Sequence, residues 1–246
     1  MIKRIFDIVF SSLGLIVLLP FLVIFAIIIW LQDRHNPFYI ASRVGKNFKN
    51  FKMIKLRTMV PNADKTGVDS TSGDDKRITP IGKIIRRYKL DELSQLWNVL
   101  LGQMSLVGPR PQVQRDVNLY TEEEKHLLDV APGITDFSSI IFSDESEILK
   151  GKGDPDLAYN QLIRPWKSRL GLFYIKNRTL LVDFKIILLT ALAIISRSKA
   201  LKGIHSILSS LNAPEDLQRI SLRNIKLIPM PPPGAENIVQ SRALFS

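Results

Sequence analysis

The amino-acid sequence predicts an α+β, mainly helical fold, in which a re-entrant membrane helix precedes a membrane-surface domain with a small β-hairpin. Three observations carry this prediction: an uncharged apolar run at residues 8–31, a strand–turn–strand pattern at 37–60, and apolar residues at helical spacing further along. We expect three segments: the membrane helix at 1–33, a cytoplasmic domain with interfacial helices at 34–204, and an extended tail at 205–246.

The composition limits the classes of protein and of site. The chain has 246 residues, of which 46% are hydrophobic, so it can bury a sizeable core. Its formal net charge of +11 indicates an anionic partner such as a nucleic acid, an acidic lipid or a phosphorylated substrate. Without cysteine, the chain cannot form disulfides or use a cysteine nucleophile. Its three histidines lack metal-ligand spacing, so we expect no histidine metal site.

The apolar run at residues 8–31 is long enough for a membrane helix. As a straight helix it would reach roughly 36 Å, and a hydrocarbon core is about 30 Å thick. Pro20 lies in its middle and is expected to bend or break the helix. Lys3 and Arg4 precede the run and Arg34 follows it, and basic flanks favour the cytoplasmic side. A re-entrant hairpin, which leaves both flanks in the cytoplasm, is therefore favoured over a simple span.

The next hundred residues predict a hairpin, a loop and helices. Basic residues alternate with aromatic or apolar ones at 37–60, and Gly45-Lys46-Asn47 predicts a tight turn between two short strands. Residues 61–77 are polar and predict a surface loop. Residues 78–101 predict one or two helices, because their leucines repeat at helical spacing.

The carboxy-terminal half predicts further helices and a tail. Thr121 followed by Glu124 is the pattern of a capping box. Residues 183–195 predict an apolar helix too short to span a bilayer, and the basic residues that follow favour an interfacial position. From about residue 210 the chain is polar and leads to a proline-rich stretch, which predicts a loosely held tail.

Two adjacent carboxylates, Asp91 and Glu92, follow a cluster of cations and are the first candidates for chemistry. Neighbours on an α-helix differ by about 100°, so one carboxylate could bind a metal while the other reacts. Arg86 lies slightly over one helical turn before Asp91 and could bind a phosphate beside it. Taken alone, such an acidic pair more often complements the helix dipole.

Three more cations are candidates for anion binding. Arg110 lies between Pro109 and Pro111, which restrict the backbone and reduce the entropy lost when the arginine binds an anion. Lys55 and Arg57 would lie on one face of a strand, at a spacing that suits a phosphate. An ordinary surface turn and a solvated strand face are the plain alternatives. The chain has no P-loop and no Gly-x-Ser-x-Gly nucleophile motif.

The order of these motifs resembles the monotopic phosphoglycosyl transferases, the bacterial sugar transferase family, over residues 1 to about 196. Any single motif is weak, but their joint order and spacing are highly specific. The motifs are Lys3-Arg4-Ile5-Phe6-Asp7, the apolar run with its proline, Arg43-Val44-Gly45-Lys46, Lys55-Leu56-Arg57-Thr58-Met59, Leu90 to Leu100, and Met104 to Pro111. Two departures are Leu19, where the family often has serine, and Asp136-Phe137-Ser138-Ser139, where it often has glycine and tryptophan.

The resemblance implies a cytoplasmic catalytic domain and a Mg²⁺-dependent reaction in two steps. Asp91 would attack the β-phosphate of a UDP-sugar and release UMP, and polyprenol (undecaprenyl) phosphate would then accept the sugar phosphate from the covalent sugar-phosphoryl-aspartate. Glu92 would hold Mg²⁺, while Arg86 and Arg110 would bind phosphate oxygens. Pro109 and Pro111 would hold Arg110 in place.

The implied partners are the UDP-sugar, the polyprenol phosphate and the cytoplasmic face of the bacterial inner membrane. The resemblance is compatible with a homo-oligomer, and nucleic acid is not expected as a partner. Two alternatives make different predictions. A non-catalytic membrane-anchored basic protein that binds anionic lipid or nucleic acid would be indifferent to Asp91→Asn. A metal-dependent phosphoesterase would use the same carboxylates but take water as its acceptor.

Overall fold

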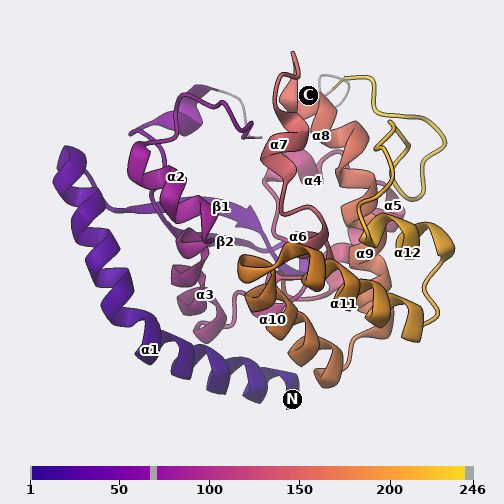
Figure 1. The fold of residues 1–246 in the computed structure, drawn as a ribbon, viewed down its shortest axis with the longest axis horizontal. Helices are drawn as coiled ribbons and strands as arrows, with labels where there is room; N and C mark the ends of the chain where they lie inside the picture. The colour runs from indigo at the N-terminus through magenta and orange to yellow at the C-terminus, as the bar shows by residue number, and fades with distance from the viewer. Residues whose placement is uncertain (1, 67–70, 242–246) are drawn as a thin grey trace.

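The computed structural model describes residues 2–66 and 71–241. Within them the chain is mainly helical, with a small β-hairpin, as predicted. One side of the molecule holds the amino-terminal helix, the hairpin and two short helices, and the other side holds the carboxy-terminal helices (Figure 1). A continuous apolar core joins the two sides and includes Val99, Met104, Ile140, Ile163 and Leu170, all nearly inaccessible to solvent.

Helix α1 (Ile2–Asp33) is one continuous helix that contains Pro20. It bends near its middle, so that one limb lies along the lower edge of the molecule and the other rises beside the hairpin (Figure 1). An internal proline accounts for such a bend, because it removes a hydrogen bond and crowds the preceding turn. The helix is long and apolar enough to cross a membrane, with a mean hydropathy of 3.0 over its most apolar window.

The first limb of α1 is fixed to the rest of the protein by polar contacts. The Arg4 guanidinium donates to the carbonyl of Leu100 at 2.7 Å, where a helix end leaves its carbonyls unpaired. The buried Asp7 carboxylate accepts hydrogen bonds from the Leu106 amide and the Ser105 hydroxyl, both at 3.0 Å. Helix α1 is therefore joined to the rest of the fold and is not a separate appendage.

Two small sheets follow. Strands β1 (Phe38–Val44) and β2 (Asn50–Leu56) form the predicted antiparallel hairpin, and the 3₁₀ turn η1 (Lys46–Phe48) connects them. Asn47 in this turn has a φ of 53°, a left-handed conformation that asparagine tolerates better than most residues. Strands β3 (Ser105–Val107) and β4 (Gly133–Thr135) form a parallel pair.

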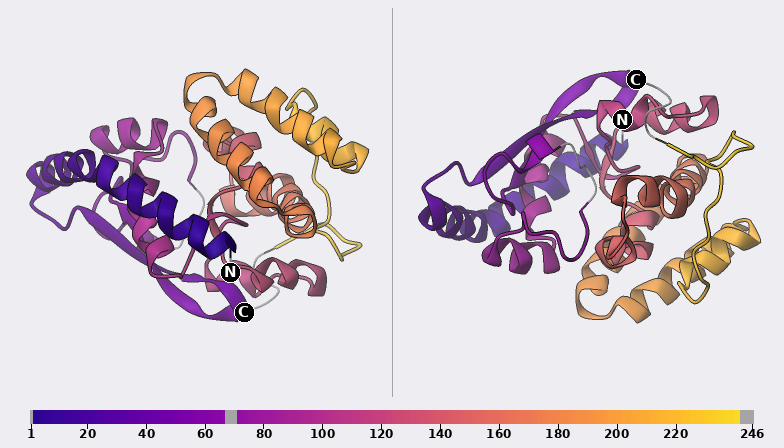
Figure 2. Two further views of the ribbon diagram at one scale, coloured as in Figure 1. Left: turned by 90° about the horizontal axis from the view of Figure 1, so that it is seen from below. Right: turned by 90° about the horizontal axis from the view of Figure 1, so that it is seen from above.

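The remaining elements are short helices around the hairpin and longer ones beyond it. Glu122–Lys125 begins with the predicted capping box of Thr121 and Glu124. The longer helices pack as a separate layer, which is seen best from below and above (Figure 2). The bounds are η2 Ala63–Thr66, α2 Pro80–Arg87, η3 Leu90–Gln95, α3 Leu96–Leu100, α4 Gln114–Val117, α5 Glu122–Lys125, η4 His126–Asp129, α6 Phe137–Ile141, α7 Glu145–Leu149, α8 Pro155–Leu162, α9 Arg164–Asn177, α10 Leu180–Ile195, α11 Arg197–Ser210 and α12 Glu215–Ser221.

The extended tail predicted at 205–246 is wrong for its first part. Helices α11 and α12 occupy most of residues 205–221 and bury Leu208, Leu217 and Ile220 against the core. The polar composition of this segment concealed a narrow apolar stripe at helical spacing. Residues 222–241 are largely irregular but are held in place: the Gln161 side chain, for example, donates to the Val239 carbonyl at 2.8 Å.

Candidate active site

The two candidate carboxylates lie on the 3₁₀ helix η3, not on the α-helix assumed from the sequence. Lys89, with a φ of 55°, interrupts the helical path between α2 and η3. Asp91 and Glu92 consequently face the same cation, with the Lys55 ammonium 3.9 Å from an Asp91 oxygen and 3.5 Å from a Glu92 oxygen. Both carboxylate side chains are 13% exposed, so water screens these contacts only weakly.

Side chains of η3 and α3 hold strand β2 in the position that brings Lys55 to the carboxylates. The Ser94 hydroxyl donates to the Ile54 carbonyl at 3.1 Å. The Asn98 amide donates to the Lys52 carbonyl at 2.7 Å and accepts from the Ile54 amide at 3.0 Å. These roles were not predicted from the sequence. The signal was three polar residues, Ser94, Gln95 and Asn98, in an otherwise apolar stretch at 93–101.

Arg110 is the closest cation to Glu92. Its guanidinium donates to a Glu92 carboxylate oxygen at 2.6 Å. Pro109 and Pro111 are both buried, so the backbone on either side of Arg110 is fixed in the core. That the two prolines restrict this arginine for anion binding stays a prediction.

Two glycines explain how the arginine-bearing segment is positioned. The Gly108 amide donates to the Thr135 carbonyl at 3.0 Å, and the Gly133 amide donates to the Pro109 carbonyl at 2.9 Å. A Cβ atom on Gly133 would lie 2.1 Å from the Gly108 nitrogen, so no larger residue fits there. This close approach of two backbones places Arg110 at the end of β3, beside η3.

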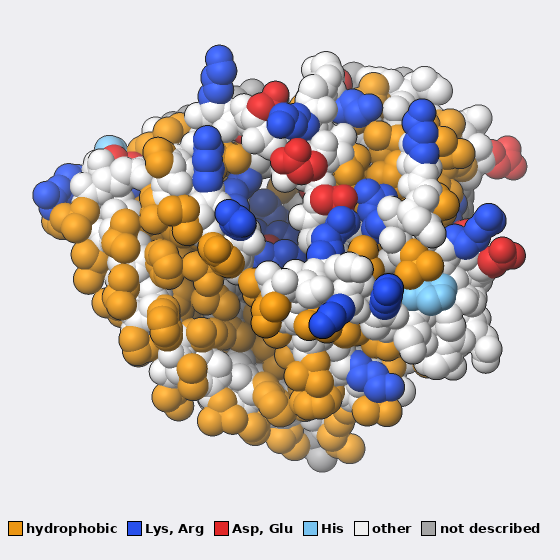
Figure 3. Space-filling model, viewed as in Figure 1, with side chains coloured by type: hydrophobic (Ala, Val, Ile, Leu, Met, Phe, Trp, Pro, Cys, Tyr) orange, Lys and Arg blue, Asp and Glu red, His pale blue; other side chains and the backbone are white. Residues whose placement is uncertain are grey.

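Two more cations border the carboxylates. The Arg86 guanidinium donates to the Thr58 hydroxyl at 2.9 Å, and its charge lies close enough to lower the pKa of Asp91. Lys89, which was not predicted as a site residue, donates to the Ser139 carbonyl at 3.0 Å. In the space-filling view a hollow lined by lysine and arginine opens between the two sides of the molecule (Figure 3).

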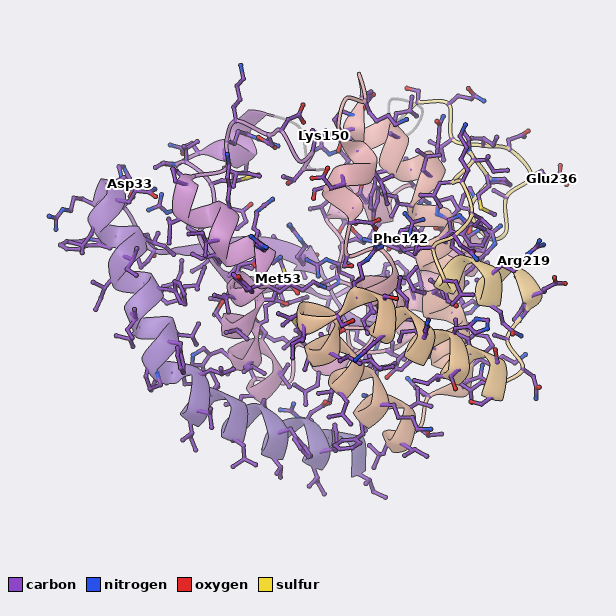
Figure 4. All side chains as sticks on the ribbon, in the orientation of Figure 1. Asp33, Met53, Phe142, Lys150, Arg219 and Glu236 are labelled. Carbon is purple, nitrogen blue, oxygen red and sulfur yellow. The ribbon has the colours of Figure 1, made fainter. Side chains whose placement is uncertain are left out.

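Arg57 lies apart from this cluster, against the expectation that it joins Lys55 on one face of a strand. Strand β2 ends at Leu56, and the Arg57 guanidinium turns to Asp33, with hydrogen bonds of 2.5 and 2.6 Å to its carboxylate. Asp33 lies at the far end of α1 (Figure 4). Arg57 therefore joins the second limb of α1 to the end of the hairpin.

The surroundings move the pKa values of the two carboxylates in opposite directions. Burial raises the pKa of Asp91 and outweighs the attraction of Lys55. Burial would also raise the pKa of Glu92, but Arg110, Lys55 and Lys89 together lower it well below its ordinary range. Burial lowers the pKa of Lys55 itself. Paired carboxylates with separated pKa values are a common arrangement for distinct chemical roles.

The side chains of this site suit a metal ion only when an anionic substrate is bound beside it. No group of three or more potential ligands among His, Asp and Glu occurs in the described part of the chain. Glu92 is ionised and offers carboxylate oxygen, but Lys55 and Arg110 repel a free cation. Mg²⁺ commonly binds one or two carboxylates together with substrate phosphates, and this site matches that pattern.

Comparison with known proteins identifies the family. The family model for bacterial sugar transferases matches residues 1–197. This chain belongs to the bacterial sugar transferase family. The match covers all of the cation and carboxylate residues described above and ends at the start of α11.

Three curated members of the bacterial sugar transferase family are similar to the chain. An exopolysaccharide production protein of Rhizobium leguminosarum is 36% identical over 80% of this chain and 97% of its own length. A UDP-N-acetylgalactosamine-undecaprenyl-phosphate N-acetylgalactosaminephosphotransferase of Aeromonas hydrophila is 30% identical over 74% of this chain. An undecaprenyl-phosphate galactose phosphotransferase of Salmonella typhimurium is 33% identical over 81% of this chain. The alignments span only 44% and 41% of the last two relatives.

Proposed function

We propose that this protein transfers a sugar 1-phosphate from a UDP-sugar to polyprenol (undecaprenyl) phosphate and releases UMP. The observation that carries the proposal is the Asp91–Glu92 pair, which Lys55 and Arg110 contact from two other segments of the chain. Similarity to relatives named as undecaprenyl-phosphate sugar phosphotransferases supports it. The product would begin the synthesis of a bacterial glycoconjugate.

In the first proposed step an Asp91 oxygen attacks the β-phosphorus of the UDP-sugar. The bond between that phosphorus and the bridging oxygen breaks, and UMP leaves with the electron pair. The raised pKa of Asp91 favours this role, because a more basic carboxylate is a better nucleophile once it is ionised. Arg110, Lys55 and Arg86 are placed to neutralise phosphate charge as the bond breaks.

In the second proposed step an oxygen of the polyprenol phosphate attacks the phosphorus held on Asp91. The acyl-phosphate bond breaks and returns the Asp91 carboxylate, and the product is a polyprenyl-diphosphate sugar. Glu92, which stays ionised, would hold Mg²⁺ together with the diphosphate, and the metal would supply charge neutralisation. Arg110 and Lys55 would then exchange part of their contact with Glu92 for contact with phosphate.

An apolar groove beside the carboxylates supports a lipid acceptor. It has a volume of about 350 Å³ and lies between the second limb of α1 and the segment η3–α3. Its lining is almost wholly apolar and includes Leu22, Ala26, Trp30, Phe38 and Trp97. Ser94 also lines the groove, and its hydroxyl donates to the Asp91 backbone carbonyl at 3.3 Å, so the groove reaches the main chain of η3 at the residue proposed as nucleophile.

The proposed location is the cytoplasmic face of the bacterial inner membrane, with α1 as a re-entrant helix. The bend of α1 and its exposed apolar side chains, among them Ile16, Val17 and Phe21, support this orientation. A lipid phosphate in that leaflet and a water-soluble nucleotide sugar would then reach the carboxylates from opposite sides.

The deciding experiment measures UMP release from UDP-sugars by the detergent-solubilised protein with Mg²⁺ and polyprenol phosphate. We expect release that depends on the lipid phosphate and on Mg²⁺ and is lost in Asp91→Asn. Asp129→Asn, which changes an exposed carboxylate, should keep full activity. Full activity of Asp91→Asn would refute the nucleophile, and release of sugar phosphate to water without lipid would favour a phosphoesterase instead.

A further inference from the structure

The carboxy-terminal segment that follows the family match packs back against the loop between α6 and α7. Arg223, just after α12, donates to one Asp144 oxygen at 3.3 Å, and Arg197, at the start of α11, forms an ion pair with the other at 2.9 Å. Arg197 also donates to the Ile141 carbonyl at 3.1 Å. The Arg223 guanidinium lies 5.1 Å from the centre of the Phe142 ring, near the middle of the view in Figure 4.

The segment that these two arginines contact, the loop between α6 and α7 with the adjoining ends of both helices, forms a wall of the proposed active site. At the start of it, the Ser139 carbonyl on α6 accepts the hydrogen bond from Lys89. At its end, the Glu145 carboxylate on α7 pairs with Lys167. Lys167 and Arg110 line the same narrow crevice, and the charge of Lys89 lowers the pKa of Glu92. The wall thus contacts one cation, Lys89, whose charge acts on Glu92, and another, Lys167, that shares a crevice with Arg110.

Arg223 is held at this place at an energetic cost. Its φ of 54° is in the left-handed region that residues other than glycine rarely adopt. Its side chain is 11% exposed, and its Nε and Nη1 atoms are buried without a hydrogen-bond partner in residues 2–66 and 71–241. A strained backbone and unpaired buried donors both disfavour folding, so a surrounding contact must compensate. The contact that the structure offers is the one with Asp144 and Phe142.

We propose that Arg223 is a positioning residue that acts through Asp144. It holds residues 139–145, so that Lys89, which bonds Ser139, and Lys167, which pairs with Glu145, stay directed at the phosphates of the nucleotide-sugar donor. The proposal rests on the proposed transferase function, since it concerns the binding of that donor. It assigns a role to a part of the chain that the family model does not cover.

The first test compares Arg223→Gln with Arg219→Gln, a matched change on the exposed face of α12. We expect Arg223→Gln to raise the KM for the UDP-sugar roughly three- to tenfold with kcat changed less than about twofold. Arg223→Lys, which keeps the charge near Asp144, should restore most of the affinity. Equal KM values for Arg223→Gln and Arg219→Gln would overturn the proposal.

The second test measures amide hydrogen exchange of residues 137–149 by mass spectrometry and needs no activity. Arg223→Gln and Asp144→Asn should each speed exchange there, the double variant should exchange no faster than Asp144→Asn alone, because Asp144 also pairs with Arg197, and Arg219→Gln should match the wild type. Asp144→Asn tests the same contact if Arg223→Gln does not fold. Unchanged exchange would overturn the role of Arg223, whereas a wild-type protein without transferase activity would overturn the proposed function. Faster exchange with an unchanged KM would reduce Arg223 to a structural residue and also overturn the proposal.

Discussion

At the scale of single residues, the site depends on one lysine shared by two carboxylates. Lys55 lies within 4 Å of both Asp91 and Glu92, yet burial and the other cations move the two pKa values apart. The order of the motifs was enough to predict that the two carboxylates lie near two arginines, namely Asp91 and Glu92 near Arg86 and Arg110. The shared contact with Lys55 was not, because it depends on a strand register and on the break at Lys89.

The pH dependence of the reaction should report the pKa of Asp91. In the proposed mechanism Asp91 must be ionised to attack, so kcat/KM should fall as the pH drops through a pKa above the ordinary value of 3.8. Since Lys55 lowers the pKa of Asp91, Lys55→Met should move this acid limb to higher pH. Lys52→Met changes an exposed lysine on the same strand and should leave the limb in place. An acid limb that does not move in Lys55→Met would contradict the assignment.

Arg110 should matter more for the reaction than for the fold. Arg110→Gln removes a charge that faces the expected phosphate, and we predict a loss in kcat/KM of about 10²- to 10³-fold. Steady-state kinetics with a UDP-sugar would measure it. The control is Arg87→Gln, because Arg87 is exposed on α2 and should be replaceable with little effect. A loss of less than about threefold for Arg110→Gln would place the phosphate elsewhere.

At the scale of elements, local patterns were predictable and long-range polar contacts were not. The hairpin turn at Gly45-Lys46-Asn47 and the capping box at Thr121 are set by neighbouring residues, and both predictions are confirmed. The pair of Arg57 with Asp33 joins residues 24 positions apart. Nothing in the alternation of β2 indicates that the strand ends one residue before Arg57. The same limit explains why α11 and α12 were not predicted in the tail, because these helices form by packing on distant helices.

The pair of Asp33 and Arg57 should stabilise the junction between α1 and the hairpin. Asp33→Asn leaves the nearly buried Arg57 without its charged partner, and we expect a loss of about 1–3 kcal/mol in the free energy of unfolding. Thermal unfolding in detergent would show a lower Tm than wild type. Asp64→Asn, on an exposed turn, should unfold with the wild type. An unchanged Tm for Asp33→Asn would mean that the pair contributes no net stability.

At the scale of the whole molecule, apolar and cationic surfaces are separated. Exposed apolar side chains gather over α1 along the lower left of the view, and the cation-lined hollow opens above them (Figure 3). A sequence with a net charge of +11 and one long apolar helix predicted both surfaces. It did not predict that one hollow would lie between two halves joined by a common core.

The absence of cysteine allows a direct test of the re-entrant helix. Single cysteines at Ile2 and Gln32, which flank the apolar run and are exposed, can be labelled with a membrane-impermeant maleimide. In intact spheroplasts we expect neither to react, and both should react once the membrane is opened. Lys152→Cys, an exposed position in the domain that we expect in the cytoplasm, serves as the control. Labelling of Ile2→Cys alone in intact cells would establish a simple span instead.

The attachment of α1 at both ends has a consequence for how the enzyme meets its lipid. Arg4 and Asp7 bond one limb to the domain, and Asp33 bonds the other. In the proposed orientation the domain cannot leave the bilayer without giving up these bonds, so its depth is fixed. The acceptor must then arrive by lateral diffusion within the leaflet. When polyprenol phosphate is limiting, the turnover rate should follow its mole fraction among the lipids. The rate should not depend on the concentration of polyprenol phosphate per volume of buffer.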